Sequence, residues 1–421
     1  MGSINDERGC KVKIRDVLMD FDINQIKRDF PFFDRNIDTI YFDNAATTQK
    51  PSCVIDCISQ YYSSYNANVH RGVYKIAEKA TYEFESSRDS IADFIGSKNR
   101  ESIIFTGGAT ESINLVAHSW AKHNLSKGDH ILLTEMEHHS NIVPWHIIAK
   151  DLDLFIDFIP ITENGELDLS NIDKLITSKT KLVSIVHQSN VLGTINPIKL
   201  IIDKAHRNGS IVLIDGAQSV AHQQINVEEL DCDFFVFSGH KIYGPTGIGI
   251  LYGKTNVLEQ MKPILGGGEM IDEVTTQGFT LNKIPWRFEA GTPPISEVIA
   301  LKEAIKYITD LGINNIFRYE EELIVELQEK LLKIENIQIY SPNHNKGPTI
   351  AFNIEGIHSY DLTKVLDEMK IAIRSGHHCA QPLMAALGIS SSNRISLAFY
   401  NTKEELDKFI ESINRAIKIL I

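Results

Sequence analysis

Short apolar runs alternate with helical patterns through the middle of this chain. Between about residues 102 and 253, runs rich in β-branched and aromatic residues, such as 211–215 and 234–238, are separated by glycine-containing turns and by segments with helical periodicity. This alternation predicts an α/β fold with a mostly parallel sheet and helices on both of its faces. In such sheets ligands bind beyond the carboxyl ends of the strands, so the loops that follow these runs are the places where chemistry is expected.

Outside this region the pattern predicts helices near the N-terminus and a smaller α+β unit at the C-terminus. One helix is expected over residues 23–33, ending near Pro31, and one long amphipathic helix from about Ser296 to residue 332. The C-terminal pattern predicts alternating elements, namely strands over 349–353, 372–374 and 394–399 and helices over 361–369 and 403–419. For 421 residues these elements predict three parts: an N-terminal segment (1–40), a large domain (41–295) and a small C-terminal domain (296–421).

Charge and composition exclude several classes of protein. A net charge of −13 and a pI near 5.6 argue against binding to nucleic acid, because phosphate backbones attract clustered lysine and arginine. The chain has 43% hydrophobic residues but no uninterrupted apolar segment long enough to span a bilayer, so no membrane association is expected. Residues 1–8 lack the apolar core of a signal peptide and contain acidic residues, which a transit peptide avoids.

Cysteine usage bears on the compartment. The chain has five cysteines and no Cys-x-x-Cys, which fits a reducing compartment better than a disulfide framework. Cys53 and Cys57 lie at i and i+4 on one helix face without a neighbouring histidine, so we interpret them as packing residues and predict no metal site. Richness in isoleucine, asparagine and lysine is typical of AT-biased genomes, so the expected compartment is a bacterial cytoplasm or an apicoplast-type plastid stroma after removal of a transit peptide.

The most informative stretch places one thiol beside two imidazoles and a guanidinium; it reads Arg374-Ser-Gly-His-His-Cys379-Ala-Gln-Pro382. The thiolate is the reactive form of cysteine, and nearby cations stabilise it. Cys379 is therefore a candidate nucleophile or sulfur carrier. The alternative is a small buried hydrophobic residue, because a free cysteine is usually buried and inert.

Two loops that follow apolar runs carry the residues that pyridoxal 5'-phosphate (PLP) requires. The predicted strand 211–215 ends at Asp215, and the predicted strand 234–238 leads into a glycine-rich loop that contains Lys241. A lysine amine forms a Schiff base with the PLP aldehyde, while an aspartate keeps the pyridine nitrogen protonated, so that the ring acts as an electron sink. Either residue alone is weak evidence, since a lysine between glycines is usually solvated.

A third loop suits the phosphate of this cofactor. Residues 106–110 form a tight loop between a predicted strand and a helix that begins at Glu111, so several backbone N–H groups and the side chain of Thr110 gather at a helix start. Ser238 and His240, close to the lysine in sequence, would supply further donors. The alternative is an ordinary capped helix, since threonine caps are common.

Taken together, these residues lie in four motifs that resemble the SufS group of cysteine desulfurases. In chain order the motifs are Glu135-Met-Glu-His138-His-Ser-Asn-Ile-Val-Pro-Trp145, Ser238-Gly-His-Lys241-Ile-Tyr-Gly-Pro-Thr-Gly247, Trp286-Arg-Phe-Glu-Ala-Gly-Thr-Pro293 and Arg374-Ser-Gly-His-His-Cys379-Ala. The resemblance runs from about Phe30 to the C-terminus. It implies the class V aminotransferase family and PLP-dependent transferase fold type I, with a mostly parallel seven-stranded-type sheet in the large domain and the cysteine in the small one. The NifS and IscS group usually carries its cysteine in a longer mobile segment, so the short motif here favours SufS.

The resemblance also implies a role for each matching residue. Those implied for the cofactor are Lys241 as the Schiff-base residue that later moves protons, Asp215 at the pyridine nitrogen, Gln218 at the ring hydroxyl, His138 on the pyridine face, Thr110, Ser238 and His240 at the phosphate, and Thr292 reaching a phosphate from the neighbouring subunit. Those implied for the substrate are Asn190, Arg374 and Arg394 around its carboxylate and His70 near it. Which arginine makes a bidentate contact stays open. The catalytic residues implied are Cys379, Lys241 and His138.

The implied reaction is removal of sulfur from L-cysteine, which gives L-alanine and a persulfide on Cys379. A SufE-like or SufU-like acceptor protein is implied to take the sulfur for iron–sulfur cluster assembly, and the enzyme is implied to be a homodimer. Two alternatives are a selenocysteine lyase and another class V aminotransferase, of which a transaminase would have no use for Cys379. A non-catalytic sulfur-assembly scaffold is a third, and the joint presence of Lys241, Asp215 and Cys379 speaks against it.

Overall fold

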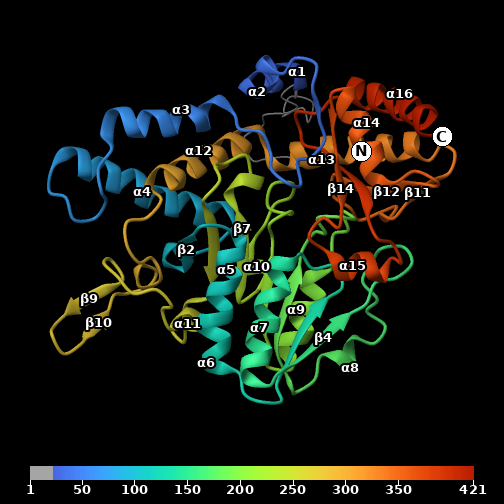
Figure 1. The fold of residues 1–421 in the computed structure, drawn as a ribbon. Helices are drawn as coiled ribbons and strands as arrows, with labels where there is room; N and C mark the ends of the chain where they lie inside the picture. The colour runs from blue at the N-terminus through green and yellow to red at the C-terminus, as the bar shows by residue number, and fades with distance from the viewer. Residues whose placement is uncertain (1–21) are drawn as a thin grey trace, which may run out of the picture.

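The computed structural model describes residues 22–421, so Cys10 and the expectations about a signal or transit peptide lie outside the described residues. At its centre is a seven-stranded sheet with the strand order β2-β8-β7-β6-β5-β3-β4 (Figure 1). The strands are β2 (Ile103–Thr106), β3 (His130–Thr134), β4 (Phe155–Ile159), β5 (Thr180–Val186), β6 (Ile211–Asp215), β7 (Phe234–Ser238) and β8 (Gly249–Gly253). β8 pairs antiparallel with β2 and β7, and the other neighbouring pairs are parallel, which confirms the predicted mostly parallel sheet.

Both faces of the inner strands of this sheet are buried, as is usual for parallel strands covered by helices. Successive side chains of β6 enter different hydrophobic cores: Val212 and Ile214 belong to one core, and Leu213 belongs to the other. The helices in and around this part are α3 (Ser52–Gln60), α4 (Lys75–Phe94), α5 (Ala109–Val116), α6 (Lys122–Asn124), α7 (Val143–Leu152), α8 (Ile172–Leu175), α9 (Ile198–Arg207), α10 (Val227–Leu230) and α11 (Thr255–Leu258). A continuous apolar run therefore marks inner strands such as β6 and β7, whereas the edge strand β4 is partly exposed and contains Asp157.

The predicted N-terminal helix over residues 23–33 is wrong, because the structure has two helices there. α1 (Ile23–Arg28) is capped by the carboxylate of Asp22, and α2 (Pro31–Arg35) begins at Pro31. Proline lacks the N–H that an interior helical residue donates, so it starts the second helix instead of continuing the first.

The predicted long helix from Ser296 is also two helices, α12 (Ile295–Leu311) and α13 (Ile313–Leu331). Gly312 separates them with a φ of 82°, a conformation that glycine adopts without steric cost and that no helix interior contains. Before α12, an exposed hairpin of β9 (Ile271–Val274) and β10 (Phe279–Leu281) extends from the body of the molecule (Figure 1).

The C-terminal part contains a four-stranded antiparallel sheet in the order β11-β12-β15-β14. Its elements are β11 (Ile337–Ile339), β12 (Thr349–Ile354), β14 (Arg374–Gly376), β15 (Ser392–Ser396), α14 (Ser359–Glu368), α15 (Gln381–Ala386) and α16 (Lys403–Leu420). Residues of α13, α14 and α16 form a separate hydrophobic core with this sheet. The predicted strands over 349–353 and 394–399 correspond to β12 and β15, although β15 ends earlier because the chain turns at Ala398.

The predicted strand over residues 372–374 is divided between two sheets. Its first part is β13 (Ile371–Ala372), which pairs in parallel with β1 (Ile40–Tyr41), and Arg374 begins β14. The N-terminal strand β1 therefore packs with the C-terminal part of the chain, and Phe42 is buried in the same core. Among the described residues, no helix has both the length and the apolar character that crossing a membrane requires.

Candidate active site

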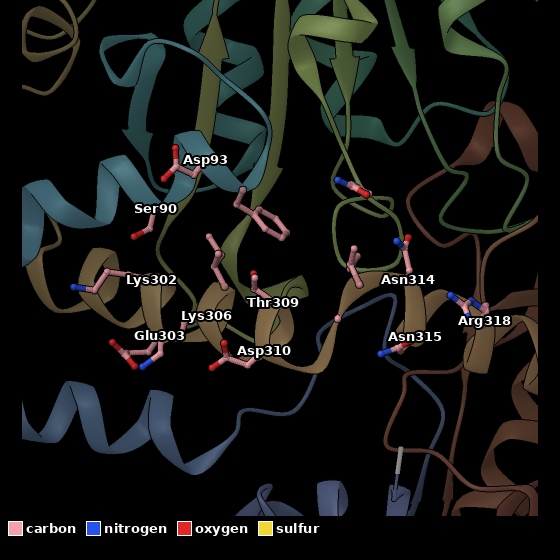
Figure 2. A pocket seen from close by; sticks show the side chains of 15 residues that line it. Ser90, Asp93, Lys302, Glu303, Lys306, Thr309, Asp310, Asn314, Asn315 and Arg318 are labelled. Atoms are coloured by element: carbon pink, nitrogen blue, oxygen red, sulfur yellow. The ribbon is translucent and has the colours of Figure 1, made fainter. Parts of the chain in front are cut away.

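A cavity of about 260 Å³ opens beyond the carboxyl ends of β5, β6 and β7. All predicted site residues except His70 and Thr292 line it, namely Thr110, His138, Asn190, Asp215, Gln218, Ser238, His240, Lys241, Arg374, Cys379 and Arg394. Larger cavities exist, and the two largest of those described, of about 820 and 740 Å³, contain none of the predicted residues. Figure 2 shows the larger of these, between α4, α12 and α13. Convergence of chemically active side chains, and not size, therefore marks the candidate site.

Lys241 and Asp215 reach this cavity from neighbouring strands. β6 and β7 are parallel, so their carboxyl ends lie at the same edge of the sheet, and Lys241 follows β7 in a short turn. Asp215 is 3% exposed and accepts a hydrogen bond from the N–H of Ala217 at 2.9 Å. Burial lowers the pKa of Lys241, an effect that the charge of Asp215 opposes. Burial also raises the pKa of Asp215, so a cation placed against it, such as a protonated pyridine, would stabilise its ionised form.

The loop between β2 and α5 forms a wall with phosphate-binding character. α5 begins at Ala109, earlier than predicted, so Ala109 and Thr110 lie in its first turn. The Oγ of Ser238 accepts a hydrogen bond from the N–H of Ala109 at 2.8 Å, which leaves the hydroxyl proton free for an acceptor in the cavity. A Cβ on Gly249 would come within 2.3 Å of Gly108 Cα, so β8 supports the loop at close range. N–H groups at a helix start beside two hydroxyls suit a dianion.

His138 and His240 line the cavity as neutral imidazoles. The Nδ1 of His138 accepts a hydrogen bond from the N–H of Ser140 at 3.1 Å, so the proton of the neutral ring lies on Nε2. Burial lowers the pKa of His138 to about 3, with Lys241 as the next cause. Burial likewise lowers the pKa of His240 to about 4. A neutral ring can stack on a pyridinium without adding a second positive charge to the cavity.

Asp43 joins the two predicted arginines, a role that the sequence reasoning missed. Arg374 donates from Nε and Nη2 to the Asp43 carboxylate at 2.9–3.1 Å. Arg394 is 2% exposed and donates from Nη2 to Asp43 at 2.7 Å and from Nη1 to the carbonyl of Asn190 at 3.0 Å. The Nε of Arg394 is buried and has no hydrogen-bond partner among the described residues. The signal that could have revealed Asp43 was an acid at the start of the small-residue turn 43–48.

Cys379 lies in a turn whose backbone is held by its neighbours. His378 and Cys379 have φ values of 53° and 55°, a left-handed conformation that costs a non-glycine residue roughly 1–2 kcal/mol. The backbone carbonyl of His378 accepts a hydrogen bond from the side chain of Asn190 at 2.8 Å. The Nε2 of the His378 ring lies 3.0 Å from both the carbonyl and the hydroxyl of Ser392. The carbonyl of Cys379 accepts the N–H of His139 at 2.7 Å. The thiol is exposed, so the alternative of a buried packing residue is wrong.

His70 and Thr292 lie outside this cavity. The Nε2 of His70 is 2.9 Å from Glu85, and its Nδ1 is 3.6 Å from Glu269. Thr292 is exposed, and the residue before it donates its N–H to the carbonyl of Gly268 at 3.0 Å. Both residues therefore lie beside the loop 266–269, away from the cavity of their own chain.

The fold and the cavity define a class of protein. Residues 40–409 match the family described as aminotransferase class-V, and the chain belongs to that family. Its large sheet, its C-terminal α+β part and the Lys241–Asp215 pair agree with PLP-dependent transferase fold type I, and PLP is the cofactor of this class.

Within this class the chain is similar to cysteine desulfurases over nearly its whole length. A cysteine desulfurase of Yersinia pestis (strain Pestoides F) is 47% identical over 406 residues, 96% of this chain and 100% of the relative. A probable cysteine desulfurase of Halalkalibacterium halodurans is 46% identical, covering 93% and 97%. The apo structure of the cysteine desulfurase from Thermococcus onnurineus NA1 superposes with a TM-score of 0.91 at 40% identity, covering 94% and 98%. The chain is therefore a member of the cysteine desulfurase branch of the family.

Proposed function

We propose that this protein uses PLP to take sulfur from L-cysteine and to hold it as a persulfide on Cys379. The observation that carries the proposal is that Lys241, Asp215 and Cys379 line one cavity. In the overall change, the C–S bond of L-cysteine breaks, an S–S bond to Cys379 forms, and the substrate carbon gains a hydrogen to give L-alanine. The substrate carbon is reduced and the transferred sulfur is oxidised, so no other oxidant is required.

The residues around the cavity fit PLP. Asp215 would face the pyridine nitrogen and His138 the ring face, while the start of α5 would hold the phosphate. Gln218, proposed to contact the ring hydroxyl, is oriented by a hydrogen bond from its Nε2 to the carbonyl of Ala45 at 2.8 Å. When bound at Lys241, PLP supplies an electron sink beside the α-carbon of the substrate. Lys241 has a pKa lowered by burial, which suits an amine that takes and returns a proton.

Features outside the cavity support proposals about the subgroup of the enzyme, its sulfur acceptor, its homodimer, its compartment and its domains. The short cysteine motif supports the SufS group, and the exposed thiol supports transfer to a SufE-like or SufU-like acceptor for iron–sulfur cluster assembly. The exposure of Thr292 outside its own cavity supports a homodimer in which it reaches the phosphate of the other subunit, and the half-buried His70 lies beside the same loop 266–269. The free thiols of the described cysteines support a reducing compartment, either a bacterial cytoplasm or a plastid stroma. The separate C-terminal core supports a large part and a small part, for which we keep the predicted boundary near residue 296, although α12 packs in the core of the large sheet and the separate core begins in α13 at Leu323.

The test supplies PLP-loaded protein with L-cysteine and a reductant, and it measures alanine and sulfide in parallel. We expect the wild-type protein to release both in equal amounts, and Cys379→Ser to keep the visible absorption of the cofactor while it loses alanine formation. Equal release by the two forms would refute the persulfide. Unchanged amino transfer to a keto acid in Cys379→Ala would instead identify a transaminase, and faster turnover of selenocysteine would identify a selenocysteine lyase. A protein without the cofactor's absorption would be the non-catalytic scaffold.

A further inference from the structure

His138 and His139 are adjacent on one turn but contact different parts of the site. His138 lines the cavity, whereas His139 contacts the cysteine turn twice. The backbone N–H of His139 donates to the carbonyl of Cys379 at 2.7 Å, and its ring Nε2 accepts the backbone N–H of Gln381 at 3.1 Å. These two hydrogen bonds attach the cysteine turn at the thiol residue itself and just beyond it.

The contact with Gln381 requires a neutral ring in one tautomer. A backbone N–H can only donate, so the Nε2 of His139 must carry a lone pair, and the ring proton lies on Nδ1. Burial lowers the pKa of His139, with His377 as the second cause, which favours the neutral form. The ring therefore acts as a fixed acceptor for the cysteine turn.

The turn that carries both histidines is anchored by a buried glutamate, whose pKa burial raises to about 8. Glu137 is 0% exposed and accepts hydrogen bonds from the hydroxyl of Thr134 at 2.7 Å, the N–H of Val186 at 2.9 Å and the amide of Asn141 at 2.6 Å. Asn141 in turn accepts hydrogen bonds from a tryptophan of α7 and a serine of β5. The turn 134–141 is thus hydrogen-bonded to strand β5 and to helix α7, and it provides a rigid support for both histidines.

We propose that His139 is a positioning residue for sulfur transfer, which holds the left-handed cysteine turn against the same support that places His138 in the cavity. This inference rests on the proposed function. The two adjacent imidazoles then have different roles. His138 lines the cofactor cavity, and His139 holds the turn that carries Cys379. Removal of the His139 ring should therefore slow formation of the persulfide and leave cofactor binding intact.

The test compares His139→Ala and His139→Gln with the wild-type protein, all loaded with PLP. The Gln side chain offers an oxygen near the position of the histidine Nε2, so it can still accept the N–H of Gln381. His146→Ala, which removes an exposed imidazole from α7, is the matched control. The measurements are the visible absorption of the cofactor, its change on addition of L-cysteine, the rate of alanine formation, and the mass of the Cys379 peptide with its added sulfur.

For His139→Ala we expect an unchanged cofactor spectrum and an unchanged response to L-cysteine, with alanine and persulfide formed about fivefold to tenfold more slowly, the effect of one lost hydrogen bond. His139→Gln should recover most of that rate. An unchanged rate in His139→Ala would overturn the proposal, and so would loss of its cofactor absorption, because the residue would then support the cofactor cavity itself. If the wild-type protein formed no alanine from L-cysteine, the proposed function would fail, and this inference with it.

Discussion

Arg394, and not Arg374, is expected to bind the carboxylate of the substrate. Arg374 is exposed, and its Nε and Nη2 are both occupied by Asp43. Arg394 is 2% exposed, lines the cavity, and has a buried Nε that no described residue accepts from. A carboxylate in the cavity would satisfy this buried donor of Arg394, whereas the guanidinium of Arg374 is exposed and open to water. We predict that Arg394→Lys impairs substrate binding far more than Arg374→Lys.

The expected rise in KM follows from the number of hydrogen-bond donors that each substitution removes. Lysine keeps the charge and can still pair with Asp43, but it cannot also replace the buried Nε–H of Arg394. One lost hydrogen bond to a charged group costs about 1.5–3 kcal/mol, which is about a 10-fold to 150-fold increase in KM. At Arg374 the ion pair is exposed, and exposed pairs contribute at most about 1 kcal/mol, so its KM should rise no more than about fivefold.

The assay is the rate of alanine formation as a function of L-cysteine concentration, from which KM and kcat are obtained for both variants. Because Arg394 also bonds to Asp43 and Asn190, thermal unfolding of each variant must show that the protein is folded at the assay temperature. A larger rise in KM for Arg374→Lys than for Arg394→Lys would refute the assignment. So would an unchanged KM in a folded Arg394→Lys protein.

Three further predictions test the cavity and its surroundings. Gly249→Ala should lower the thermal stability by roughly 1–3 kcal/mol, because its Cβ would meet Gly108; an unchanged melting temperature would contradict the close packing. Burial lowers the pKa of His187 to about 4 and that of His378 to about 3. As the pH falls, these two rings therefore stay neutral in the folded protein but become protonated in the unfolded chain. The stability that the neutral rings contribute is present above about pH 6.5 and is lost in acid. Each ring should lower the free energy of unfolding by about 1.4 kcal/mol between about pH 7.5 and 5.5, and urea unfolding at these two pH values should show a smaller loss for His187→Gln than for the wild-type protein. Asp215→Asn should bind PLP about 100-fold more weakly or worse, since a buried charge loses its partner, and a titration that gives wild-type affinity would refute the pairing.

The large sheet could be predicted from sequence because its strands are buried on both faces. The runs 211–215 and 234–238 coincide with β6 and β7, since a continuous apolar run ended by turn residues has few other interpretations. Parallel strands then bring Asp215 and Lys241 to one edge without further assumptions. The resemblance supplied the C-terminal residues of the site, which no local pattern connects to that edge.

The features that were predicted wrongly or not at all depend on tertiary contacts. The strand at residues 372–374 changes partner in mid-course, because β13 pairs with β1 while β14 pairs with β15. The resemblance implied a role for His138 but none for His139, because the contact of His139 with the cysteine turn depends on how the buried carboxyl group of Glu137 fixes the turn 134–141. The sharing of Asp43 between two arginines likewise joins residues more than 330 positions apart.

The position of the cysteine turn sets a condition on how sulfur can leave. Asn190 and His139 hold this turn from loops of the large sheet, and Ser392 holds it from the C-terminal sheet. A turn bonded on both sides, with a left-handed backbone at Cys379, has little freedom to carry its sulfur away from the cavity. Because the thiol is nevertheless exposed, we expect the acceptor to bring its own thiol to Cys379. An acceptor with its cysteine on a protruding loop meets that condition, whereas one with a buried cysteine would require the turn to be released first.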